Sequence, residues 1–439
     1  MNNINDETLK VLQKSYDKKP KHQVLKRVLY QTDLGSIFTK QEEARNNHFL
    51  FSNEIKTLPI TNQKQTGRCW IFAGLNVLRE IVAKKFGLKD FELSQNYTAL
   101  FDKLEKINYF IESIDDFLEV DSDDRTFQHI LKTGIQDGGQ WDMFVSVIEK
   151  YGVVPQIIMP ETDNSSNTRF INKLIDLKLR KYAADVRKIK TNKPAIKALK
   201  AKTLDELYSL LISNFGEVPT TFDFEYVNDE GFHIIKDLTP QKFYHEIIGD
   251  VLSEYISVIN APTSDKPFHK TFTVAYLGNV VGGGEIKYLN LPINELKELI
   301  ITQLKSGELV WFGSDVATYG DRVTGFWDDA SFDYENVLDM HLEMAKADQL
   351  VYSQGAMNHA MLLTGVHLDG VNAKRWKIEN SWGNKGGKDG YYVCSDTWFD
   401  KFVYQGVINK KHLSKEQLAM WNQAPIVLKP WDPMGSLAD

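Results

Sequence analysis

The sequence predicts an α+β fold in which helices come first along the chain and short strands follow. Apolar residues recur at helical spacing between residues 70 and 82, whereas short runs rich in β-branched and aromatic residues begin at about residue 268. At 439 residues the chain is long for one hydrophobic core, so we expect two to three structural units or one large domain with insertions. This order of elements favours a site between two lobes.

The first part of the chain contains a series of helix signals. Residues 5–30 carry apolar positions at helical spacing and are interpreted as a helical arm. A buried helix is predicted to begin at Cys69, and Ser94 is suited to cap a second helix. A third helix is expected to follow the run 138–141 and to end near residues 151–152, where a glycine is followed closely by a proline.

The character of the sequence changes twice after Pro155. Lys-rich helical patterns at 168–191 and 194–214 predict an inserted helical subdomain. Short strand-like runs then follow at 272–276, 309–312, 361–366 and 391–393.

Composition excludes several classes of function. The net charge of −7 and pI of about 5.9 argue against a general binder of nucleic acid or anionic membranes. A basic run at 180–202 leaves a non-catalytic polyanion-binding scaffold open, although a solvated helix face is the interpretation we favour. No apolar run approaches a membrane span and the N-terminus lacks an apolar signal region, so we expect a cytoplasmic protein.

Two cysteines, Cys69 and Cys394, provide neither a disulfide framework nor a set of zinc ligands. We therefore expect no metal and no cofactor. Cys394 lies in a strand-like run and is interpreted as a packing residue. Cys69 differs because unpaired N–H groups and the helix dipole favour a thiolate at a helix N-terminus, where a thiol pKa can fall from about 8.5 to roughly 3.5–7.5. The alternative for Cys69 is a small buried apolar side chain.

Three further residues supply what a cysteine nucleophile needs. His359 precedes an apolar strand, Asn380 follows another strand, and Gln63 lies six residues before Cys69. These residue types suit a general base, a group that orients the base, and a neutral donor to an oxyanion. Trp382 is near enough in sequence to cover an Asn380–His359 hydrogen bond. Each residue alone has an ordinary alternative: a structural histidine, a turn residue, or a surface-loop glutamine.

The ordered set Gln-(five residues)-Cys-Trp, His-Ala and Asn-Ser-Trp-Gly resembles the papain superfamily of cysteine peptidases. Residues 69 and 359 lie 290 positions apart, against about 130–150 in papain-type enzymes, which calls for a large insertion. The insertion, the N-terminal arm and the ending 430–439 resemble the bleomycin hydrolase and aminopeptidase C family, the cytosolic branch of that superfamily.

This resemblance implies a two-lobe fold with a helical lobe, a β-barrel-like lobe, a large helical insertion and two terminal arms. The expected units are 1–50 for the N-terminal helical arm, 51–155 for the helical lobe with Cys69, 156–267 for the inserted helical subdomain, 268–410 for the β-rich lobe with His359 and Asn380, and 411–439 for the C-terminal arm.

The resemblance also implies roles for individual residues. Cys69 would be the nucleophile, His359 the general base and acid, Asn380 the group that orients His359, and Gln63 an oxyanion donor together with the Cys69 N–H. The catalytic set is therefore Cys69, His359, Asn380 and Gln63, and the substrate-binding set is Gly138, Gly139, Trp382, Ala438 and Asp439. The two glycines would let a substrate backbone approach closely, although by themselves they could form a simple turn.

The C-terminal segment combines Pro430, Trp431, Pro433 and Met434, which make it stiff and apolar. In the resembling family this segment lies in the cleft and its carboxylate meets the free amine of the substrate. That arrangement implies a cysteine aminopeptidase that acts on peptides with a free N-terminus through a Cys69–His359 thiolate–imidazolium pair and an acyl-enzyme. A papain-like endopeptidase is the nearest alternative. The family also implies self-association as a homohexamer. The composition described above predicts no membrane partner and argues against a nucleic-acid partner.

Overall fold

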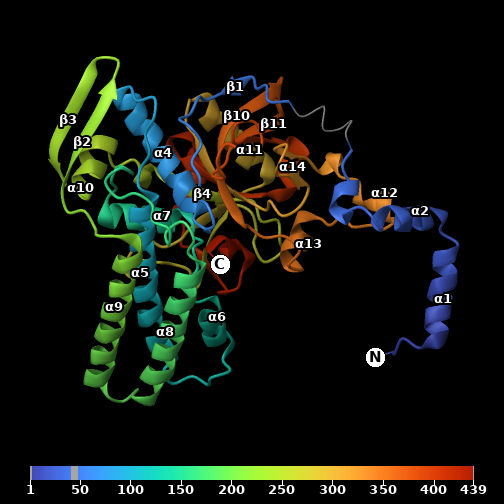
Figure 1. Cartoon of the computed structure of the whole chain (residues 1–439), viewed down its shortest axis with the longest axis horizontal. Helices are drawn as coiled ribbons and strands as arrows, with labels where there is room; N and C mark the ends of the chain where they lie inside the picture. Colours follow the sequence, from blue (N-terminus) through green and yellow to red (C-terminus); the bar gives the residue numbers. More distant parts are fainter. Residues whose placement is uncertain (1, 41–47, 439) are drawn as a thin grey trace.

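A group of long helices lies beside a large mixed sheet, and a helical arm extends away from this body (Figure 1). The computed structural model describes residues 2–40 and 48–438. Within them, the α-helices are α1 (Asp6–Asp17), α2 (Pro20–Leu29), α4 (Cys69–Phe86), α5 (Gln95–Ser113), α6 (Arg125–Thr133), α7 (Trp141–Tyr151), α8 (Arg169–Lys188), α9 (Lys193–Phe215), α10 (Pro240–Lys242), α11 (Ile293–Lys305), α12 (Tyr334–Leu338), α13 (Lys346–Val351), α14 (Asp396–Phe402) and α15 (Lys415–Trp421).

The sheet has the strand order β14-β5-β6-β4-β13-β7-β10-β11-β12-β9-β8, and β1 pairs with β10 beside this path. Most pairs are antiparallel, while β14–β5, β4–β6 and β12–β9 are parallel. Its strands are β1 (Asn53–Glu54), β4 (Tyr255–Ile259), β5 (Lys270–Val274), β6 (Tyr288–Asn290), β7 (Val310–Ser314), β8 (Gly320–Asp321), β9 (Phe326–Trp327), β10 (His359–Asp369), β11 (Asn372–Glu379), β12 (Tyr391–Ser395), β13 (Val403–Asn409) and β14 (Ile426–Leu428). The α+β prediction is confirmed by this arrangement.

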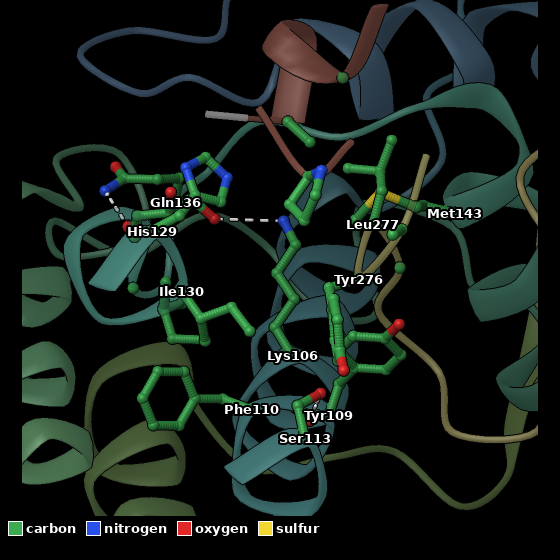
Figure 2. A pocket seen from close by; sticks show the side chains of 18 residues that line it. Lys106, Tyr109, Phe110, Ser113, His129, Ile130, Gln136, Met143, Tyr276 and Leu277 are labelled. Carbon is green, nitrogen blue, oxygen red and sulfur yellow. Dashed lines mark hydrogen bonds between the residues drawn. The ribbon is translucent and has the colours of Figure 1, made fainter. Parts of the chain in front are cut away.

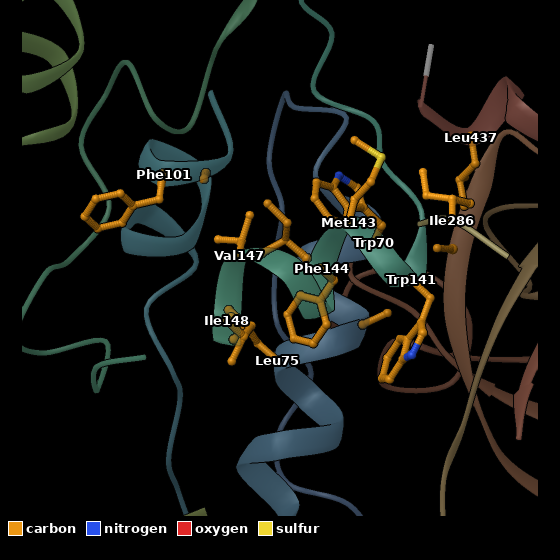
Figure 3. Close-up of a cluster of buried hydrophobic side chains, with 14 of the residues drawn as sticks. Trp70, Leu75, Phe101, Trp141, Met143, Phe144, Val147, Ile148, Ile286 and Leu437 are labelled. Atoms are coloured by element: carbon orange, nitrogen blue, oxygen red, sulfur yellow. The ribbon is translucent and has the colours of Figure 1, made fainter. Parts of the chain in front are cut away.

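Helix α4 is the central element of the core. It is apolar on nearly every side, because it packs against helices α5 and α7 on one side and strands β7 and β10 on the other. Gly74 allows the close approach of α7, since a methyl group there would lie 2.8 Å from the Phe144 ring. Figure 3 shows the resulting cluster, in which Trp70 and Leu75 of α4 meet residues of α7 and, at its edge, Leu437 of the C-terminal segment.

Local sequence signals set the helix boundaries close to those predicted. The Ser94 side chain accepts from the Tyr97 N–H and caps α5, as expected. Helix α7 ends at Tyr151 before Gly152, whose φ of 73° is accessible to glycine at little cost. The Lys-rich patterns correspond to α8 and α9.

The segment 156–267 is only partly helical, which corrects the expected composition of the insertion. After α9 the chain forms a separate hairpin of β2 (Phe222–Asn228) and β3 (Gly231–Leu238). Strand β4 then enters the main sheet between β13 and β6. The short apolar run of β4 favours a strand, because it is buried among partners that lie far away in sequence.

The basic run 180–202 lies on α8 and α9, and most of its charges have local partners. Lys181 and Lys188 pair with Asp185, and Lys190 pairs with Glu119. Lys200 pairs with both Glu112 and Asp115. These pairs neutralise much of the positive field, so the run is a solvated and paired helix surface.

The N-terminal arm makes few contacts with the body. Helices α1 and α2 contain no buried residue. Lys21 and His22 of α2 both contact the carboxylate of Asp339. Residues 1 and 41–47 of the predicted arm lie outside the described residues. In the described ranges, no helix is both long and apolar enough to cross a bilayer.

Candidate active site

Cys69 lies where the first turn of α4 meets the first residues of β10. The backbone N–H of Ala360 donates to Cys69 Sγ at 3.4 Å. His359 is the first residue of β10 and directly precedes this donor. The pairing of β10 with β7 and β11 holds this strand in place, so a rigid sheet carries the imidazole to the start of the nucleophile helix.

The orientation of His359 follows from its bond to Asn380. His359 Nε2 lies 2.8 Å from Asn380 Oδ1. The same oxygen accepts the Ser381 N–H at 2.8 Å, which identifies it as the acceptor end of the amide. A neutral His359 therefore donates through Nε2 and keeps Nδ1 as the proton acceptor.

Trp382 covers the His359 ring. The two rings stack with centroids 4.7 Å apart at an angle of 27°. Trp382 is itself packed edge-on against Trp327 and Tyr392. This aromatic support excludes water from the imidazole and strengthens its hydrogen bond to Asn380.

Burial shifts the pKa values of Cys69 and His359. The shift at Cys69 is opposite to the lowered thiol pKa expected from the sequence. Burial raises the pKa of Cys69 to about 11, although the N–H groups of Ala360, Trp70 and Cys69 oppose the shift. Burial also lowers the pKa of His359 to about 4, against the effect of its Asn380 bond. Desolvation opposes the charged form of both groups and works against the favourable field of the helix terminus.

Gln63 is held beside the nucleophile by two bonds of its side-chain amide. Its Nε2 donates to the Thr66 carbonyl at 2.7 Å, and its Oε1 accepts from Ser381 Oγ at 2.6 Å. One amide hydrogen remains for a further acceptor. Ser381 was not singled out from the sequence as a site residue, although it lies inside the Asn-Ser-Trp-Gly motif.

These residues line one cavity of about 630 Å³ between the helices and the sheet. Cys69, His359, Gln63, Trp382 and Gly138 all contribute to its wall. Asn380 lies behind His359 and is buried. The structure therefore brings together the four predicted catalytic residues and two of the predicted substrate-binding residues.

Asp137 organises the wall between Cys69 and Gly138 and was not predicted. Its carboxylate accepts from Lys103 at 2.6 Å, from the Gly67 N–H at 3.0 Å and from Asn172 at 2.9 Å. Burial alone would favour the neutral acid, yet Lys103 and these donors hold the pKa of Asp137 well below its usual range. Its only sequence signal is its position next to the Gly138-Gly139 pair.

The two glycines have different surroundings. A methyl group at Gly138 would lie 2.3 Å from the Leu437 carbonyl oxygen, so only glycine admits the C-terminal segment there. A methyl group at Gly139 would lie 2.5 Å from the Trp70 ring. Gly138 lines the cavity, whereas Gly139 provides room for the tryptophan that follows Cys69.

A smaller cavity of about 100 Å³ lies behind Gly138, between α5, α6 and the C-terminal segment (Figure 2). Lys106 reaches up from α5 and donates to the carbonyls of Gln136 at 3.1 Å and Gly138 at 2.5 Å. Gly435 and Ala438 of the C-terminal segment also line this cavity. Lys106 thus supports the glycine segment from behind.

Several contacts hold the C-terminal segment in the cleft. Asp432 pairs with the buried Lys266 at 2.8 Å. The guanidinium of Arg125 lies 3.8 Å from the centre of the Trp431 ring. Ser436 Oγ donates to the Met357 carbonyl at 2.9 Å, and Ser436 and Leu437 line the cavity that contains Cys69.

Ala438 lies beside Gly138, and Asp439 falls outside the described residues. No local sequence pattern predicted the Asp432–Lys266 pair, because the two residues are 166 positions apart.

The α+β fold, with a cysteine at a helix terminus that shares one cavity with a histidine at the start of a strand and an asparagine behind that histidine, defines a papain-like cysteine peptidase. The chain belongs to the peptidase C1-like family, whose model matches residues 3–435.

Curated relatives and a solved structure agree with this assignment. Aminopeptidase C of Listeria monocytogenes is 49% identical over 390 residues, which cover 89% of this chain and 88% of the relative. Aminopeptidase C of Lactobacillus delbrueckii subsp. lactis is 47% identical over 395 residues, covering 88% of each. The crystal structure of PepW from Lactobacillus rhamnosis HN001 superposes with a TM-score of 0.96 at 44% identity over 99% of both chains.

Proposed function

We propose that the protein removes N-terminal residues from peptides through a Cys69–His359 pair and an acyl-enzyme. Its class, a cysteine-type aminopeptidase, is supported by the family and by the curated relatives. One observation carries the finer proposal. Ser436 and Leu437 of the C-terminal segment line the same cavity as Cys69, so this segment occupies part of the cleft that a longer substrate would need.

The chemical steps follow from the geometry. His359 Nδ1 accepts the Cys69 thiol proton as Sγ attacks the scissile carbonyl carbon, which becomes a tetrahedral oxyanion. The Cys69 N–H and the free amide hydrogen of Gln63 stabilise that oxyanion. The C–N bond then breaks, and the protonated His359 transfers its proton to the departing amine.

Hydrolysis of the acyl-enzyme completes the cycle. A water molecule loses a proton to His359 and attacks the thioester carbon. The C–S bond breaks, the proton returns from His359 to the sulfur, and the product leaves as a carboxylic acid that ionises in solution. Asn380 keeps Nδ1 directed at the reacting atoms throughout, because it holds the opposite ring nitrogen.

The proposed specificity arises from the closed end of the cleft. In this proposal the C-terminal segment leaves space for one substrate residue before the scissile bond, and a terminal carboxylate there would attract the free ammonium group of the peptide. The decisive experiment compares the full chain with a variant lacking residues 436–439 on free and N-acetylated peptides. We expect the full chain to cleave only the free peptides and the truncated chain to gain cleavage of the acetylated ones.

Equal rates of the full chain on free and acetylated peptides would favour the endopeptidase alternative. Replacement of Cys69 by Ala tests the chemistry separately, since turnover should be lost while the fold persists. The polyanion scaffold receives little support from the paired charges of α8 and α9. Affinity for a polyanion that falls steeply with salt would revive it.

The proposal includes a cytosolic location and assembly as a homohexamer, both taken from the resemblance to the bleomycin hydrolase and aminopeptidase C family. Helices α1 and α2 support self-association, because apolar side chains such as Leu9, Leu12 and Val24 are exposed on them. Light scattering coupled to size-exclusion chromatography would measure the mass of the assembly. A monomeric mass would contradict this part of the proposal.

A further inference from the structure

Arg322 lies at the tip of the short hairpin formed by β8 and β9. The turn is closed by the Gly325 N–H, which donates to the Asp321 carbonyl at 2.9 Å. The Asp321 carboxylate accepts the N–H groups of Val323 and Thr324 at 2.8 and 3.2 Å. The adjacent carboxylate bonds within the turn and forms no ion pair with Arg322.

The Arg322 side chain lies over the aromatic cover of the candidate active site. Its guanidinium is 4.7 Å from the centre of the Trp382 ring, and Trp382 stacks on His359. The Tyr392 hydroxyl donates to the Arg322 carbonyl at 3.0 Å and holds the backbone in place. A guanidinium that stacks on an aromatic face keeps its edge N–H groups free for planar acceptors such as carboxylates.

The charge of Arg322 is uncompensated at this position. In the described ranges 2–40 and 48–438, its guanidinium has no carboxylate within ion-pair distance and donates to no protein oxygen. Its field reaches the site, because after burial it contributes to the lowered pKa of His359. Arg322 lines the cavity that contains Cys69, so the wall of this cavity carries a cation able to bind an anion.

The position of Arg322 in the cavity indicates which part of the substrate it meets. The C-terminal segment contacts Gly138 and Met357, whereas Arg322 contacts Trp382 and Tyr392, so the two line different parts of the cavity wall. The proposed function, on which this step rests, directs the substrate N-terminus to the C-terminal segment. The peptide beyond the scissile bond then extends past Trp382.

We propose that Arg322 forms a carboxylate-binding subsite for the part of the peptide that follows the scissile bond. The stacking distances of His359 on Trp382 and of Trp382 on Arg322 are 4.7 Å each. An extended residue spans about 3.3–3.6 Å, so Arg322 lies within reach of the first residues after that bond. Two kinds of carboxylate fit this subsite. One is the C-terminal carboxylate of a di- or tripeptide, and the other is an Asp or Glu side chain at the same distance from the scissile bond.

The test compares peptides that differ only in one carboxylate. Trialanine is measured as the free acid and as the C-terminal amide, and a second pair compares Ala-Ala-Glu amide with Ala-Ala-Gln amide. For the wild-type enzyme we expect kcat/KM to be about 3- to 10-fold higher for the carboxylate member of at least one pair, as for a partly exposed charged hydrogen bond. The pair that responds identifies the source of the carboxylate.

Arg322→Gln should reduce that ratio to about 1, and Arg322→Lys should retain part of it. Arg169→Gln is the matched control, because Arg169 also lines the cavity but lies at the start of α8, and its ratio should remain that of the wild type. A wild-type ratio near 1 in both pairs, or a ratio unchanged in Arg322→Gln, would overturn the subsite while leaving the aminopeptidase proposal intact. Failure of the wild-type enzyme to release the N-terminal residue from any of these peptides would instead refute the proposed function, and the subsite with it.

Discussion

Arg79 and Glu379 form a buried ion pair, with 3.1 Å between Arg79 Nη2 and Glu379 Oε1. Arg79 belongs to α4, the helix that begins at Cys69, and Glu379 ends β11 directly before Asn380. Asn76 of α4 donates to the same carboxylate oxygen at 2.9 Å. The pair therefore connects the element that carries the nucleophile to the element that orients the histidine.

Replacing Glu379 by Ala should destabilise the protein by about 3–5 kcal/mol, because Arg79 would remain buried without its counter-charge. Urea unfolding measures this change as a shift of the midpoint. Glu54→Gln is a suitable control, since Glu54 is partly exposed and its pair with Lys377 should contribute about 1 kcal/mol or less. A similar shift for both variants would contradict the structural role of the buried pair.

Ser381→Ala should lower kcat by about 10-fold with little change in KM. Ser381 Oγ holds the Gln63 side-chain amide, and a donor that must reorient stabilises the oxyanion less well. Steady-state kinetics of Ser381→Ala, Gln63→Ala and the double variant separate this role from a general structural one. If Ser381 acts through Gln63, the double variant should be no slower than Gln63→Ala.

The alkylation rate of Cys69 by iodoacetamide should increase with pH toward about 11, because only the thiolate reacts and burial raises the pKa of this thiol. The rate should increase by about tenfold per pH unit below that value. Mass spectrometry of the alkylated chain gives the rate, and Cys69→Ser corrects for the buried Cys394. A rate that is constant from pH 5 to 8 would instead show a preformed thiolate–imidazolium pair.

Asp432→Asn should release the C-terminal segment from the cleft. The variant loses the ion pair with Lys266, which is buried and lies 2.8 Å away. Cleavage of N-acetylated peptides should therefore increase while release of free N-terminal residues decreases. The control is Asp265→Asn, because Asp265 also contacts Lys266 but is mostly exposed. An unchanged ratio of acetylated to free peptide cleavage in Asp432→Asn would exclude this anchoring role.

Local sequence determined much of the helical structure. The start of α4 at Cys69, the Ser94 cap and the ends of α7, α8 and α9 follow from caps, glycines and 3.6-residue periodicity, which act within a few residues. The ordered motifs around residues 63–70, 359–360 and 380–383 also predicted the peptidase family correctly. The catalytic roles of those residues remain predictions.

Only the tertiary structure decided the properties that depend on distant parts of the chain. Strand β4 belongs to the main sheet because β13 and β6 pair with it, and neither partner is near in sequence. The Arg79–Glu379 and Lys266–Asp432 pairs have the same non-local origin. Desolvation at Cys69 likewise depends on the whole packed core, so the thiol pKa moved opposite to the prediction from its helix terminus. Sequence thus determined which chemical groups the protein has, and folding decided their neighbours and their charge.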